Sequence, residues 1–142
     1  MILVDANLLL YAYNQRAADH RASKLWLEAS LSGQLLVRFA WLSLWAFLRI
    51  STNPRVFEQP LTMNEAEEAV GAWLAQPVAG MLDPGERHWE ILRTLTQTGQ
   101  TSGPLVMDAA LAAIAIEYGA TLCTTDRDFA RFPGLKWTNP LT

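Results

Sequence analysis

Three aspartates stand at points of the chain where folding would bring their side chains together. Asp5 directly follows the apolar run at 2–4, Asp108 stands at the front of an alanine-rich segment, and Asp126 follows the segment 121–124. Carboxylates that meet repel one another and lose hydration, and a bound dication removes that cost. Oxygen ligands favour Mg²⁺, with Mn²⁺ as its substitute, over zinc. The three aspartates are therefore candidate magnesium ligands.

Each aspartate also has a purely structural explanation. Asp108 could cap a helix, and Asp126 and Asp128 could form a turn by accepting hydrogen bonds from their own backbone. Asp5 is harder to explain in this way, because a carboxylate directly after a buried strand is costly without a partner. For Asp5, function and structure are about equally good explanations.

The expected fold explains why such distant residues would meet. Strand-like and helix-like segments alternate, which predicts an α/β fold with a parallel sheet of about four to five strands covered on both faces. In such a sheet the carboxyl ends of the strands and the starts of the following helices converge on one crevice. The predicted strands are 2–4, 35–39, 78–82, 121–124 and 135–138. The predicted helices are 19–32, 41–50, 62–76, 83–97 and 105–118, with a short turn or helix at 126–132.

Local signals mark several of the predicted helix ends. The segment Thr62-Met-Asn-Glu65 fits a capping box, in which the threonine hydroxyl and the glutamate carboxylate accept from free backbone N–H groups. Asp83-Pro84 fits an N-cap followed by proline at the first helical position. Gly119 fits the left-handed residue that often closes a helix at its C-terminus.

Size and composition favour one soluble, cytoplasmic domain over residues 1–142. With 51% hydrophobic residues, a chain of 142 residues can build one core. The lone Cys123 lies in an apolar run and is expected to be a buried thiol in a reducing compartment. The first residues lack the basic leader of a signal peptide. No apolar stretch approaches the roughly 20 residues of a membrane-spanning helix, so no membrane association is expected.

The net charge of −3 argues against broad electrostatic binding of nucleic acid. Positive charge is nevertheless concentrated locally, because Arg38, Arg49 and Arg55 fall in one short segment. Arg49 and Arg55 are candidates for contacting phosphate, which a guanidinium matches bidentately. A salt bridge or a protein contact would explain them equally well. His20 and His88 are too far apart in sequence to suggest a zinc pair.

Most of the large apolar side chains are assigned to the core or to an interface. Trp26, Trp73 and Trp89 lie in helix-like segments, where burial of an apolar face is the ordinary explanation. Another apolar group could supply a surface for self-association, although core packing accounts for it equally well. The members of this group are Leu8, Leu9, Tyr11, Trp41 and Trp45.

Three segments, in order along the chain, carry a resemblance to a known family. They are Leu-Val-Asp5-Ala-Asn7-Leu-Leu-Leu-Tyr, Met-Asp108-Ala-Ala-Leu-Ala-Ala-Ile-Ala and Cys-Thr-Thr125-Asp126-Arg-Asp128-Phe-Ala-Arg-Phe-Pro-Gly. Together with Phe-Leu-Arg-Ile-Ser-Thr-Asn-Pro-Arg-Val-Phe, they resemble the successive motifs of PIN-domain nucleases, and of VapC toxins in particular. The resemblance spans nearly the whole chain, and its specificity lies in the ordered set of motifs.

The resemblance implies a Rossmann-like three-layer α/β/α domain that cleaves RNA with Mg²⁺. It also implies a homodimer and inhibition by a VapB-type antitoxin. Metal binding and catalysis would fall to Asp5, Asp108 and Asp126. Supporting roles would fall to Asn7, Thr125 and Asp128, of which Asp128 could act beside Asp126 or in its place.

One position departs from the family pattern. PIN nucleases commonly place a glutamate directly before the Phe-Leu-Arg element, and here that position is Ala46. The whole segment 33–57 contains no Asp or Glu. Three carboxylates can still hold Mg²⁺, which keeps several waters, and Ser43 is a candidate for holding one of those waters. The expected function is a Mg²⁺-dependent endoribonuclease toxin.

Two other functions remain open. A PIN domain without the glutamate could be catalytically weak or inactive and act as an RNA- or protein-binding module. A phosphoryl-transfer or phosphoacceptor domain of the same architecture would use Asp5 as a nucleophile. Against this second alternative, Asn7 lacks the carboxylate that such chemistry uses as an acid–base group, and no lysine is well placed in a late strand.

Overall fold

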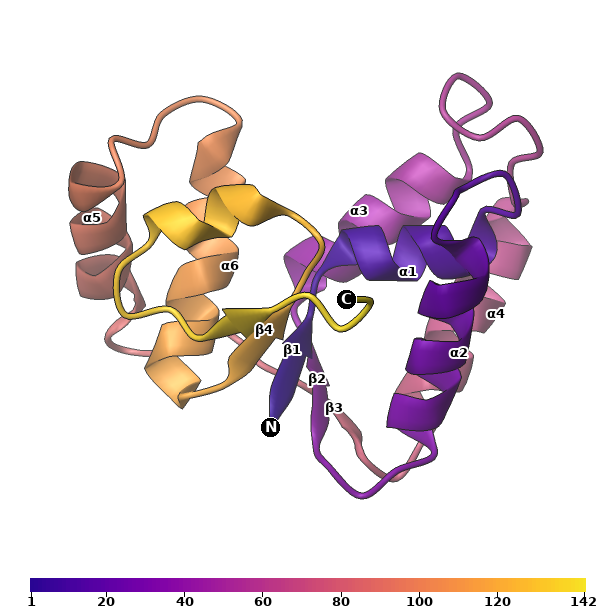
Figure 1. The fold of residues 1–142 in the computed structure, drawn as a ribbon, viewed down its shortest axis with the longest axis horizontal. Coiled ribbons are helices and arrows are strands. Elements are labelled where there is room, and N and C mark those ends of the chain that lie inside the picture. The colour runs from indigo at the N-terminus through magenta and orange to yellow at the C-terminus, as the bar shows by residue number, and fades with distance from the viewer.

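The computed structural model describes residues 1–142, and a five-stranded parallel sheet runs through its centre (Figure 1). The strand order is β3-β2-β1-β4-β5, so the first strand of the chain lies in the middle. The predicted α/β fold with a parallel sheet is thus confirmed. The strands are β1 (Ile2–Val4), β2 (Val37–Phe39), β3 (Ala79–Met81), β4 (Thr121–Cys123) and β5 (Trp137–Thr138).

Helices cover both faces of this sheet, which confirms the three-layer α/β/α arrangement. One buried cluster joins the sheet to α1, α2, α3 and α4, and a second joins the opposite face to α5, α6 and η1. Figure 1 shows these two groups of helices on either side of the strands. The helices are α1 (Ala6–Tyr13), α2 (His20–Leu31), α3 (Trp41–Ser51), α4 (Met63–Leu74), α5 (His88–Thr98), α6 (Leu105–Tyr118) and the 3-10 helix η1 (Arg127–Arg131).

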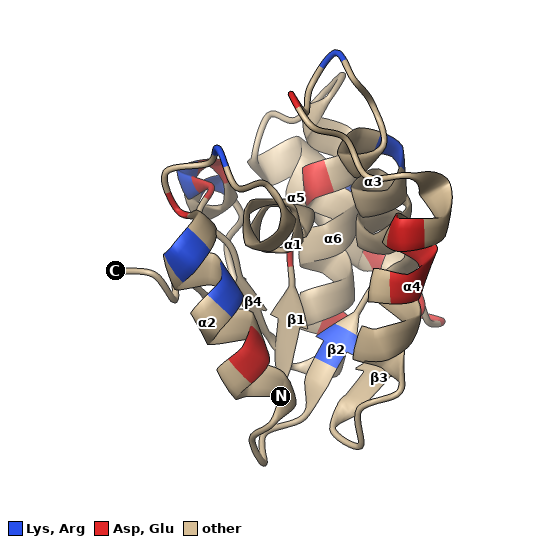
Figure 2. Ribbon diagram, turned by 90° about the vertical axis from the view of Figure 1, so that its right-hand side faces the viewer, with Lys and Arg blue, Asp and Glu red and all other residues tan.

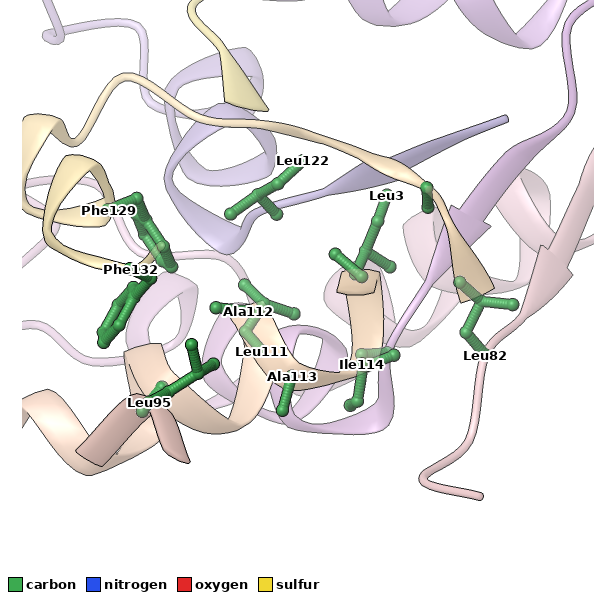
Figure 3. Packing of buried hydrophobic residues seen from close by; sticks show 14 residues of the cluster. Leu3, Leu82, Leu95, Leu111, Ala112, Ala113, Ile114, Leu122, Phe129 and Phe132 are labelled. Atoms are coloured by element: carbon green, nitrogen blue, oxygen red, sulfur yellow. The ribbon is translucent and has the colours of Figure 1, made fainter. Parts of the chain in front are cut away.

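The central strand β1 is apolar because neighbours bury both of its faces. Side chains alternate across a strand, so Leu3 packs in the cluster of α6 while Val4 packs in the cluster of α1. Figure 3 shows Leu3 and Leu122 of the sheet above Ile114 and Ala112 of α6. Asp5 is the first residue after this buried strand, so its carboxylate stands at the carboxyl edge of the sheet.

The helix α6 packs closely on the sheet because its buried face is built of small side chains. Ala109, Ala112 and Ala113 are fully buried there. Gly119 ends the helix with φ +67°, the left-handed conformation that its lack of a Cβ allows, as predicted. This close packing places Asp108, in the first turn of α6, beside the carboxyl edge of the sheet.

The capping box at Thr62 and Glu65 is confirmed, but the predicted helix start at Asp83-Pro84 is wrong. The helix α5 begins only at His88. The reason is an anchor at the end of α6, where the Glu117 carboxylate accepts hydrogen bonds from the backbone N–H groups of Gly85 (2.9 Å) and Arg87 (3.1 Å). These bonds hold the segment 83–87 as a loop.

Other departures concern residues that the sequence pattern placed inside. Trp73 is 3% exposed, as expected for a core residue, but Trp89 is 68% exposed because it lies on the solvent face of α5. The predicted strand at 35–39 begins only at Val37, and the helix α1 was not predicted. Among the proposed interface residues, Leu8 and Leu9 are fully buried in the core.

None of the helices combines the length and the apolar character needed to cross a lipid bilayer.

Candidate functional site

The carboxylate of Asp5 is buried at the point where β1 passes into α1. Asp5 is the N-cap of α1, and its Oδ1 accepts a hydrogen bond from the backbone N–H of Ala6 at 2.7 Å. Its Oδ2 accepts a second hydrogen bond from the hydroxyl of Thr124 at 2.8 Å. Burial raises the pKa of Asp5, the two hydrogen bonds oppose that rise, and the charge of Asp126 adds to it. Asp5 is therefore held in place and electrostatically strained.

Thr124 is the hydrogen-bonding hub of the site. Its hydroxyl donates to Asp5 and accepts from the side-chain amide of Asn7 (3.2 Å) and from the backbone N–H of Asp126 (3.0 Å). The parallel register between β1 and β4 explains this position. Val4 pairs with Cys123, and the next residues along the two strands are Asp5 and Thr124, which therefore lie side by side. Thr124 thereby links the carboxyl ends of two neighbouring strands.

Asp126 and Asp128 lie where β4 leads into η1. The backbone N–H of Asp128 donates to Oδ1 of Asp126 at 2.9 Å, so Asp126 caps this 3-10 helix. The turn-forming role considered from the sequence is therefore real. It leaves Oδ2 of Asp126 without a hydrogen bond and its charge close enough to act on Asp5 and Asp108.

Asp108 carries the clearest sign that negative charge is crowded here. Burial, together with the charges of Asp5, Asp126 and Asp128, raises its pKa from 3.8 to about 6. Arg131 of η1 opposes it. Four acids from three parts of the chain thus act on one another at the carboxyl edge of the sheet.

A hollow of about 380 Å³ opens beside these acids. Asp5 and Asp108 line it together with residues of α3 that include Ser43, Ala46 and Arg49. Ala46, the position at which the resemblance implied a glutamate, therefore lines the same hollow as the two carboxylates. The absent glutamate leaves open space in the site.

Two buried oxygens near the acids have no hydrogen-bonding partner. They are the hydroxyl of Ser43, which lines the hollow, and Oδ1 of Asn7, whose amide group is tied to Thr124. Buried polar atoms are nearly always satisfied, so the unpaired hydroxyl of Ser43 on the hollow is a place for a ligand or a water.

The donor set fits a hydrated hard cation. No group of three acidic, histidine or cysteine side chains lies close enough to share an ion directly. Mg²⁺, however, is commonly bound through one or two carboxylates plus waters. Asp5 and Asp108 on the hollow, with Ser43 beside them, match that requirement. Direct ligation by Asp126 stays a prediction.

The other predicted site residues are distributed unevenly. Arg49 lies on the hollow, whereas Arg55 lies in the exposed turn after α3 and does not line it. Thr125 makes no hydrogen bond to the acids and lines a separate depression with Arg127 and Trp137. The hydroxyl that bonds to Asp5 is that of the neighbouring Thr124, and a supporting role for Thr125 stays a prediction. Sequence reasoning also missed Arg131, although it stands three residues after Asp128 in the quoted motif.

Comparison with known proteins establishes the family. The family profile of the PIN domain matches residues 2–135. Ribonuclease VapC37 of Mycobacterium tuberculosis is 45% identical over 141 residues, which are 99% of this chain and 97% of that protein. Ribonuclease VapC33 of the same species is 40% identical and is covered to 99%. The chain belongs to the VapC family of PIN-domain proteins. The resemblance inferred from the ordered motifs is thus confirmed.

Solved structures agree with this PIN-domain fold. VapBC2 from Rickettsia felis, bound to a DNA fragment from its promoter, matches with a TM-score of 0.69 and 21% identity over 98% of each chain. VapC20 of Mycobacterium tuberculosis, described as a Sarcin-Ricin loop cleaving toxin, matches with a TM-score of 0.66 and 18% identity over 96% of this chain and 99% of that one. At such identities the likeness establishes the fold of the PIN domain.

Replacing Asp108 by asparagine should stabilise the metal-free protein in a pH-dependent way. The pKa of Asp108 is raised to about 6, so the folded state binds its proton more tightly than the unfolded chain. Stability therefore falls as pH rises through the window from about 4 to about 6. The melting temperature of Asp108→Asn in EDTA should exceed that of the wild type at about pH 7.5, and the gain should vanish near pH 4. A gain independent of pH would contradict this electrostatic account.

Replacing Thr124 by valine should disrupt the site, because the isosteric change leaves three polar groups without their shared partner. The expected loss is about 1–3 kcal/mol of unfolding free energy, measured by urea denaturation. Thr124→Ser keeps the hydroxyl and should recover most of the loss. Thr125→Val is the matched control and should stay within about 0.5 kcal/mol of the wild type. Equal effects at the two positions would argue against Thr124 as the hub.

Proposed function

We propose that this VapC-family protein is a metal-dependent endoribonuclease, with Mg²⁺ as its natural cofactor, controlled by a VapB-like antitoxin. The observation that carries the proposal is the convergence of Asp5, Asp108 and Ser43 on one hollow at the carboxyl edge of the sheet. The names of the relatives, which are ribonucleases at 40–45% identity, support RNA as the substrate. The reaction would be hydrolysis of a phosphodiester bond.

Asp5 and Asp108 would hold the ion, and Thr124 would keep the Asp5 carboxylate oriented toward it. When bound, Mg²⁺ lowers the pKa of a coordinated water and neutralises charge on the phosphate. Ser43 would hold a water through its unpaired hydroxyl. Asp126 would orient or deprotonate the attacking water through its free Oδ2, and Arg49 would bind the scissile phosphate from α3.

The crowded acids also suggest how a partner would inhibit the enzyme. Several neighbours in fold are VapBC complexes, which supports a VapB-like antitoxin for this chain as well. A segment of the antitoxin that offers an arginine to Asp5 and Asp108 would neutralise them and occupy the place of the cation. A homodimer and action in the cytoplasm stay predictions.

The alternative of a catalytically weak PIN domain is favoured by one observation. Ala46 lines the hollow, so the family's usual glutamate is missing from the place where its carboxylate would meet Asp5 and Asp108. Such a domain would still bind RNA or the antitoxin. Its cleavage rate would respond strongly to restoration of the carboxylate.

Purified protein should cleave RNA in the presence of Mn²⁺ or Mg²⁺ but not in EDTA. The variant Asp5→Asn removes the charge of the most buried acid and should lower the rate by about 100-fold or more. Asp83→Asn changes an exposed acid in the loop before α5 and is the matched control. Cleavage that persists in EDTA, or that survives Asp5→Asn, would refute the proposed mechanism.

Restoring the carboxylate should strengthen metal binding. The variant Ala46→Glu adds a third acid to the hollow and should raise the affinity for Mn²⁺ on the order of ten-fold, together with the cleavage rate. The added charge should also lower the melting temperature in EDTA. Ala29→Glu, on the exposed face of α2, controls for the change in net charge. If both variants bind Mn²⁺ like the wild type, the hollow is not the metal site.

A further inference from the structure

Two tryptophans of α3 are exposed directly beside the hollow. Trp41 is 44% exposed and Trp45 is 60% exposed, although burial of tryptophan is strongly favoured. Their rings stack on one another with centroids 6.5 Å apart and planes 24° from parallel. The two residues are four positions apart, so they stand one above the other on the same side of the helix. Together they form an aromatic platform, defined here as Trp41 and Trp45.

The aromatic platform is continuous with the candidate active site. Trp45 itself lines the hollow with Asp5 and Asp108, and Arg49, one turn further along α3, lines it as well. A nucleotide chain whose phosphodiester lies between these acids and Arg49 would therefore have the ring of Trp45 within its surroundings. Nucleobases stack on exposed aromatic rings, and unpaired nucleotides can be splayed onto them.

The charge distribution makes stacking the more important source of affinity. The net charge is −3, and Figure 2 shows both signs of charge on α2 and acidic positions on α4, with no continuous basic face in that view. Phosphate contacts alone would then bind RNA weakly. Aromatic stacking does not depend on net charge and tolerates any base.

We propose that the aromatic platform binds an unpaired nucleobase next to the scissile phosphodiester. This inference rests on the proposed ribonuclease function. Trp45 would stack directly on the base, and Trp41 would support the ring of Trp45 from behind. Arg49 would contact the adjoining phosphate. A second copy of this chain would also find an apolar surface here, but the presence of Trp45 and Arg49 on the wall of the hollow favours the nucleotide.

The test is binding of a fluorescein-labelled, unstructured oligoribonucleotide to the full chain in EDTA, followed by anisotropy. Because no cleavage is needed, the result is independent of the ribonuclease proposal. Trp45→Ala should raise the Kd by roughly 5- to 100-fold, and Trp45→Phe should recover much of the affinity. The matched control is Trp89→Ala, which removes a comparably exposed tryptophan from α5 and should leave the Kd unchanged. A duplex RNA of the same sequence should bind more weakly than the single strand.

Trp45→Leu separates stacking from apolar contact, because leucine keeps the apolar surface but offers no aromatic face. It should bind RNA as poorly as Trp45→Ala. Light scattering on each variant measures self-association in parallel. Full RNA affinity in Trp45→Leu, or loss of a dimer in Trp45→Ala with an unchanged Kd, would overturn the inference and assign the platform to a second copy. If cleavage fails but the pattern of Kd values holds, only the ribonuclease proposal falls.

Discussion

The buried carboxylate of Asp5 is the constraint on which the rest of the site depends. It stands at the end of the central strand, where both faces of the sheet are covered, so water cannot fully solvate it. The hydroxyl of Thr124 and the N-terminus of α1 offset part of that cost. The charge of Asp126 adds to it again, and with Asp108 nearby the site holds a concentration of negative charge that a bound cation would relieve.

Sequence reasoning recovered the fold because its signals are local and periodic. The alternation of apolar runs with helical spacing is sufficient to predict a covered parallel sheet, and the capping box and Gly119 were correctly placed. The start of α5 was missed because it depends on a long-range contact between Glu117 and the loop 83–87, for which no local signal exists. The exposure of Trp89 was missed because a helical pattern does not show which face the core covers.

The site could be predicted in part. The strand end at Asp5 and the helix start at Asp108 identified two acids, and the segment between the second and third predicted strands supplied Ser43 and Arg49 as candidates. All four line one hollow. The choice between Thr124 and Thr125 depends on the register between β1 and β4, which no single strand reveals. The role of Arg131 depends on how η1 turns back toward α6. The sequence shows that glutamate is missing at Ala46, but only the structure shows that this position of α3 lines the hollow with the acids.

Diffraction from a Mn²⁺-soaked crystal of the protein, recorded at a wavelength with anomalous signal from manganese, tests the central claim most directly. The account predicts a peak within ligand distance of the carboxylates of Asp5 and Asp108, with waters completing the shell. Absence of a peak there, with Asp5 still bound only to Thr124 and Ala6, would contradict it. The crowded acids would then be a structural feature of the sheet edge and not a metal site.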